Sequence, residues 1–121
     1  MAFINYVTQI QFDFGAVRLL RQECERVGIT RPLIVTDQGV KAAGVLQKAL
    51  DALGGMPHAV FDQTPSNPTE AAVRAAAAIY QEQRCDGLIA VGGGSAIDCA
   101  KGVAIAATHE GPLSHLSLIH I

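Results

Sequence analysis

Short apolar runs alternate along the chain with longer segments whose apolar residues recur at helical spacing. Such runs, bounded by turn residues, predict buried strands over residues 32–37, 58–61 and 88–91. Apolar positions three, four or seven residues apart predict helices over residues 16–27 and 40–53 and from residue 95 onward, and the Ala-rich composition of residues 70–83 favours a helix there. The chain is therefore expected to order its elements as helix and strand in strict alternation.

The ends of these helices carry the residue types that are favoured there. Gly28 follows residues 16–27 in the position of a helix-ending glycine, and Thr69 is placed to cap residues 70–83. Alternating strands and helices predict an α/β fold, a Rossmann-like parallel sheet with helices on both faces. Residues 4–12 alternate weakly, and we expect them to add an antiparallel hairpin at the edge of the sheet.

Three glycines and a serine separate the strand at 88–91 from the last helix. Gly92, Gly93 and Gly94 would let the backbone approach a ligand, and the first turn of the helix would offer free N–H groups to a phosphate. We interpret this segment as a pyrophosphate cradle. The competing interpretation is an ordinary turn in which Ser95 caps the helix and Asp98 completes a capping box.

Asp37 follows a strand, and the carboxyl ends of parallel strands are where ligands bind. Its carboxylate is suited to the two hydroxyls of a ribose and would repel a 2′-phosphate. The alternative is an aspartate that caps a helix or a turn before Gly39. In the usual dinucleotide fingerprint the acid follows the glycines by about 20 residues, whereas here it precedes them.

Composition narrows the class of protein. With 121 residues, 50% of them hydrophobic, and a net charge of −2, the chain is expected to form one folded domain that binds neither nucleic acid nor an anionic membrane surface. It has no apolar stretch of membrane-spanning length and no signal-peptide pattern, so we expect a cytoplasmic protein. Cys24, Cys85 and Cys99 are expected to be reduced and buried; a lowered pKa at Cys99 is the minor alternative, and no catalytic residue is assigned.

Four segments together resemble the iron-dependent (group III) alcohol dehydrogenases. Each matches a motif of that family, in the family's order and with similar gaps between them. The segments are Phe14-Gly15-Ala16, Thr36-Asp37-Gln38-Gly39, Pro65-Ser66-Asn67-Pro68-Thr69 and the stretch from Gly92 to Lys101. One departure is Val17, where a glycine is usual.

The resemblance implies an oxidoreductase that moves a hydride between a small alcohol or aldehyde and NAD, with NADP the less favoured cofactor. It places Gly92, Gly93, Gly94 and Ser95 on the pyrophosphate, Asp37 on the adenosine ribose and Asn67 near the cofactor in the cleft. From the residues alone, Asn67 reads as a turn residue before a proline. The resemblance further implies a homo-oligomer, and a divalent metal, iron or zinc, held by one Asp and three His of a helical carboxyl-terminal domain.

That helical domain has no counterpart in this chain, which has about a third of the family's usual length. We therefore expect residues 1–115 to be part of a dinucleotide-binding domain that is inactive alone and has no metal site. His58, His109, His115 and His120 match no metal position of the family and are expected in surface loops.

The last six residues, 116–121, are translatable from the transposase end sequence used in sequencing adaptors. We expect them to be a non-native tail; the alternative is a native apolar terminus. Without them no strand follows Ala107, and an exposed sheet edge is predicted.

Two other functions fit the same residues. One is a non-catalytic nucleotide-binding module, and the other is a polyol dehydrogenase of the glycerol type. Ser95 favours the alcohol dehydrogenase branch, since glycerol dehydrogenases tend to carry lysine at that position.

Overall fold

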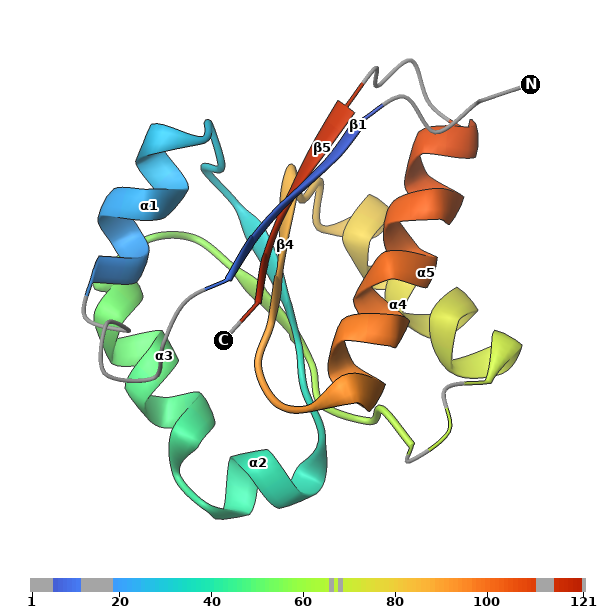
Figure 1. Cartoon of the computed structure of the whole chain (residues 1–121), viewed down its shortest axis with the longest axis horizontal. Coiled ribbons are helices and arrows are strands. Elements are labelled where there is room, and N and C mark those ends of the chain that lie inside the picture. Colours follow the sequence, from blue (N-terminus) through green and yellow to red (C-terminus); the bar gives the residue numbers. More distant parts are fainter. Residues whose placement is uncertain (1–5, 12–18, 66, 68, 111–114, 121) are drawn as a thin grey trace.

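The structure is a computed structural model that describes residues 6–11, 19–65, 67, 69–110 and 115–120. Within these ranges five strands form one parallel sheet in the order β1-β5-β4-β2-β3 (Figure 1). The strands are β1 (Tyr6–Gln11), β2 (Pro32–Val35), β3 (Ala59–Phe61), β4 (Gly87–Ala90) and β5 (His115–His120). The helices are α1 (Leu20–Arg26), α2 (Gln38–Ala42), α3 (Val45–Leu53), α4 (Glu70–Glu82) and α5 (Gly94–Glu110).

Helices cover both faces of this sheet, as the sequence predicts. Helices α4 and α5 lie on one face, and α1 and α3 lie on the other (Figure 1). Successive residues of a strand point to opposite faces, so Leu33 and Leu88 pack on the α4–α5 side, whereas Ile34 and Ile89 pack on the α1–α3 side. No helix within the described ranges has the length and apolar character needed to cross a membrane.

Strand β5 contradicts the expectation that no strand follows Ala107. It lies inside the sheet between β1 and β4, with Leu118 and Ile119 completely buried on opposite faces. These two consecutive apolar residues beside β4 complete both layers of the core. The exposed edge predicted at β4 is therefore wrong, and the non-native origin of 116–121 stays a prediction.

Strand β1 lies at one edge of the sheet, as predicted for residues 4–12, but the predicted antiparallel hairpin is wrong. It pairs in parallel with β5 from Tyr6 opposite His115 to Gln11 opposite His120. Because no strand was predicted after Ala107, the prediction contained no parallel partner for this strand. Residues 4, 5 and 12 of the predicted hairpin lie outside the described residues, as do residues 16–18 of the predicted first helix.

The helix predicted over residues 40–53 is two helices, α2 and α3. The break falls at Gly44, whose φ of +83° lies in the left-handed region that glycine adopts readily. The break separates a short helix that follows β2 from a longer helix that packs on the sheet. As a result, the residues of α2 stay at the carboxyl edge of the sheet.

Thr69 caps α4 as predicted, and its removal should cost measurable stability. Its hydroxyl oxygen accepts a hydrogen bond from the backbone N–H of Ala72 at 3.1 Å. We expect Thr69→Ala to lower the free energy of unfolding by about 1 kcal/mol, while Thr69→Ser stays close to the parent chain. Urea denaturation followed by circular dichroism measures both, and equal losses in the two variants would show that the hydroxyl does not act as the cap.

Candidate functional site

The carboxyl ends of β2 and β4 meet where the chain changes direction across the sheet. After β2 the chain returns as β3 on one side, and after β4 it returns as β5 on the other side. Ligands of open α/β sheets bind at such a switch point, in the crevice outside the strand ends. Asp37 follows β2 and Gly92 follows β4, so both predicted contact points lie at this switch point.

Thr36 ties together the three strand ends that surround the switch point. Its hydroxyl donates to the carbonyl oxygen of Val91 at 2.8 Å, and its N–H donates to the carbonyl oxygen of Phe61 at 2.8 Å. Its own carbonyl oxygen accepts from the N–H of Thr64 at 3.3 Å. The side chain is completely buried, so these bonds hold Asp37 beside the segments that follow β3 and β4.

Asp37 has one oxygen in a helix cap and the other near the glycine turn. Its Oδ1 accepts from the N–H of Val40 at 2.8 Å, which confirms the capping interpretation. Its Oδ2 lies 3.8 Å from the point where a Cβ on Gly92 would stand. The cap therefore fixes the carboxylate in an orientation that faces the turn.

The three glycines differ in what they require. Gly92 has a φ of +135°, a backbone conformation that is strained for any other residue. A Cβ there would also stand 3.1 Å from Val40 Cγ2. A Cβ on Gly93 or Gly94 would meet no atom within 4 Å. Helix α5 already begins at Gly94, so Ser95 lies inside its first turn, and the interpretation of Ser95 as the N-cap is wrong.

A pocket of about 430 Å³ opens beside these residues. It is lined by residues 37–39, by residues 63–65 and by Ser95. The structure thus brings Asp37 and Ser95 to one pocket, with Gly92 next to Asp37. Gly93 and Gly94 are exposed outside this lining, and Asn67 is exposed and does not line it.

Sequence reasoning missed Gln38, Gln63 and Thr64, which also line the pocket. The available signal was their position, because residues 62–64 directly follow the strand at 58–61 and so belong to the same carboxyl edge. Within the described chain, Thr64 is buried and its hydroxyl oxygen has no hydrogen bond of ordinary geometry. The thiol of Cys99 lies near it from the first turns of α5.

The cysteines are free and buried, as predicted. Burial raises the pKa of Cys99, and the nearby Thr64 hydroxyl opposes this only in part, so the alternative of a lowered pKa is wrong.

His58 is exposed in a loop, but the loop assignment is wrong for the other histidines: His109 lies in α5, and His115 and His120 lie in β5. Among the residues that the structure describes, no three His, Cys, Asp or Glu side chains are grouped to hold a metal ion.

Comparison with known proteins places this arrangement in one family. The family model for iron-containing alcohol dehydrogenase matches residues 7–120. The chain is 67% identical over 119 residues to a 4-hydroxybutyrate dehydrogenase of Cupriavidus necator, a match that covers 98% of the chain and 31% of that relative.

Two solved structures share the fold and part of the sequence. A 1,3-propanediol oxidoreductase superposes with a TM-score of 0.77 at 36% identity, covering 91% of this chain and 30% of that one. The sulfoacetaldehyde reductase of Bifidobacterium kashiwanohense in complex with NAD⁺ gives a TM-score of 0.76 at 27% identity, covering 99% of this chain and 35% of that one.

These matches show an α/β fold that the chain shares with solved dehydrogenases and reductases. The chain belongs to the iron-containing alcohol dehydrogenase family. It spans about a third of the length of the relatives that it matches.

Proposed function

We propose that this chain is the cofactor-binding part of an NAD-dependent alcohol dehydrogenase and is inactive alone. The observation that carries the proposal is that Asp37 and Ser95 line one pocket, with Gly92 next to Asp37, at the switch point of a parallel sheet. That position is where α/β proteins bind nucleotides. The NAD⁺ complex of the sulfoacetaldehyde reductase supports the choice of cofactor.

The described residues suit this cofactor. The open space above Gly93 and Gly94 lies at the amino end of a 17-residue helix. It suits a pyrophosphate whose oxygens accept hydrogen bonds from backbone N–H groups. The free side of the Asp37 carboxylate suits the adenosine ribose, and Ser95 would contact the pyrophosphate from the first turn. We place Asn67 near the cofactor as well, on the resemblance alone. NAD would supply the hydride acceptor, whereas the described part of the chain does not suit the family's metal.

Filling the proposed cradle should abolish nucleotide binding without unfolding the protein. A Cβ on Gly93 would meet no atom within 4 Å, so Gly93→Leu is expected to fold and to weaken ADP binding at least tenfold, which is about 1.4 kcal/mol. Amide chemical-shift titration of the chain with ADP and with NAD measures the affinity. It also shows whether the amides of residues 92–95 move.

Gly55→Leu is the matched control, because a Cβ at Gly55 also meets no atom within 4 Å and Gly55 lies outside this pocket. The control is expected to bind ADP as the parent chain does. Equal affinity in the parent chain and in Gly93→Leu would contradict the cradle. Shifts confined to residues remote from the switch point would contradict the site.

For the whole protein, we propose a cytoplasmic, metal-dependent homo-oligomer that oxidises 4-hydroxybutyrate or a similar short hydroxy acid. The support is the 67% identity to the Cupriavidus necator enzyme. The assay compares kcat/KM for 4-hydroxybutyrate and 1,3-propanediol in a longer reading frame that contains this chain and a helical domain. A preference for the diol would overturn the choice of substrate and leave the family unchanged.

A further inference from the structure

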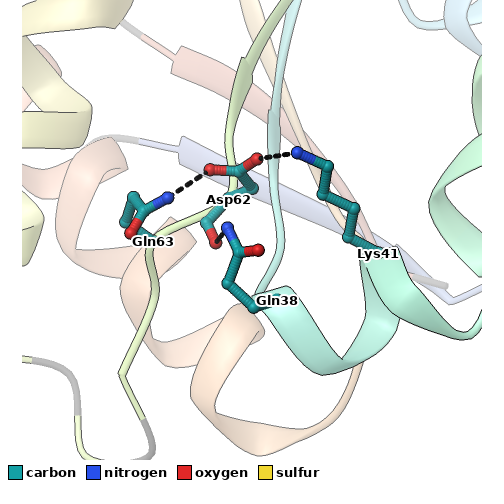
Figure 2. Close-up of polar contacts among 4 residues, drawn as sticks. All are labelled: Gln38, Lys41, Asp62 and Gln63. Atoms are coloured by element: carbon teal, nitrogen blue, oxygen red, sulfur yellow. Dashed lines mark hydrogen bonds and ion pairs between the residues drawn. The ribbon is translucent and has the colours of Figure 1, made fainter.

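An ion pair lies beside two residues of the pocket lining, Gln38 and Gln63, just after β2 and β3 end. Lys41 Nζ of α2 lies 3.0 Å from Asp62 Oδ2, which follows β3 (Figure 2). Gln63 Nε2 donates to the other carboxylate oxygen at 2.8 Å, and Gln38 Nε2 donates to the Asp62 carbonyl oxygen at 3.2 Å. Two glutamines of the pocket lining therefore help to hold the carboxylate that binds Lys41.

This pair is charged at neutral pH and only partly exposed. Lys41 and Gln63 hold the pKa of Asp62 below its usual range, so the carboxylate stays ionised. The Asp62 side chain is 22% exposed and that of Lys41 is 54% exposed, which leaves the ammonium group accessible to a ligand that could displace the aspartate.

The pair is also close in the chain to Asp37 and to the pocket lining. Lys41 follows Asp37 by four residues, one helical turn, and Asp62 directly precedes Gln63 of the lining. The lining residues, 37–39, 63–65 and Ser95, include no lysine or arginine. Lys41 is therefore a positive charge next to a lining that has none of its own, and Asp62 holds it in an ion pair.

We propose that Asp62 sets the cofactor preference of this site by holding Lys41 in an ion pair, so that the pocket accepts an adenosine nucleotide with a free 2′-hydroxyl and rejects one with a 2′-phosphate. The inference rests on the proposed function. A 2′-phosphate beside Asp37 would meet that carboxylate and no lysine or arginine of the lining. The Asp37 carboxylate opposes the added charge of such a ligand, and the positive charge of Lys41 is already neutralised by Asp62.

Asp62→Asn tests the proposal because it removes the charge while preserving the size of the side chain. It should free Lys41 and strengthen binding of 2′,5′-ADP about tenfold, with binding of 5′-AMP changed less than about twofold. The double variant Asp62→Asn/Lys41→Gln should lose that gain. Asp51→Asn is the control, because it makes the same change of net charge at a residue of α3 outside the pocket.

Amide chemical-shift titrations of the 121-residue chain at pH 8 measure all affinities. A gain for 2′,5′-ADP in Asp62→Asn alone, lost with Lys41→Gln, supports the proposal. If 5′-AMP binds and Asp62→Asn leaves the affinity for 2′,5′-ADP unchanged, or Asp51→Asn produces the same gain, the proposal is overturned and the nucleotide site stands. If the parent chain binds neither 5′-AMP nor ADP, the proposed function itself fails, and the ion-pair proposal fails with it.

Discussion

Replacing Ile119 by alanine is expected to lower the free energy of unfolding by about 2–5 kcal/mol. Ile119 is completely buried in β5, in the core layer that α1 and α3 cover. The substitution removes apolar contacts and leaves a cavity that neighbouring side chains fill only in part. Because small domains are stable by only about 5–15 kcal/mol, this loss is a large share of the total.

Ile105→Ala is the matched control, since Ile105 is 48% exposed on α5 and alanine favours helix there. Its stability should stay within about 0.5 kcal/mol of the parent chain. Urea denaturation of both variants, followed by circular dichroism, makes the comparison. Equal and small effects would show that residues 115–120 do not form an internal strand in solution. The experiment thus tests β5 without assuming how the last six residues arose.

The elements whose apolar pattern is local could be predicted from the sequence. Strands β2 and β4 are short apolar runs. Helix α4 has an Ala-rich sequence that favours helix and a cap, Thr69, that can be recognised in the sequence. Gly92 and Asp37 could be placed because carboxyl ends of parallel strands share one edge of the sheet. The break between α2 and α3 was missed, because a left-handed glycine inside a helical pattern looks the same in sequence as a tolerated one.

The parts of the site that depend on neighbouring strands could not be predicted. The hydrogen bonds of Thr36 to Val91 and Phe61 require the strand order, which the sequence alone does not give. The same holds for the ion pair of Lys41 with Asp62, residues that lie 21 positions apart. Strand β5 was missed for a different reason, because residues 116–121 were predicted to be a non-native tail.

Replacing Gly87 by alanine is expected to destabilise the chain by about 2–3 kcal/mol. A Cβ on this first residue of β4 would stand 2.4 Å from Cγ1 of Ile29 and 2.6 Å from its Cδ1. Ile29 is 1% exposed and packed in the core, so its side chain must shift to make room for the added carbon. Alanine restricts the unfolded chain more than glycine does, but that gain of up to about 1 kcal/mol is smaller than the cost of the contact.

Asp86 anchors the start of the strand beside Ile29 and opposes a shift of the strand away from it. The Asp86 carboxylate accepts from the N–H of Thr30 at 2.9 Å and from the N–H of Arg31 at 2.7 Å, and the Asp86 N–H donates to the Arg31 carbonyl oxygen at 2.9 Å. These bonds join the loops that precede β2 and β4. The extra carbon must therefore be accommodated by the core itself.

A double-mutant cycle with Ile29→Ala separates this clash from a general effect of the substitution. Ile29→Ala removes the atoms that the new Cβ would meet, so the double variant should be more stable than the sum of the two single losses predicts, by about 0.5–3 kcal/mol. Gly55→Ala, at a position with no atom within 4 Å of its Cβ, should change stability by less than about 0.5 kcal/mol. Strict additivity in the cycle would mean that Gly87 is needed for its backbone and not for the close approach of Ile29.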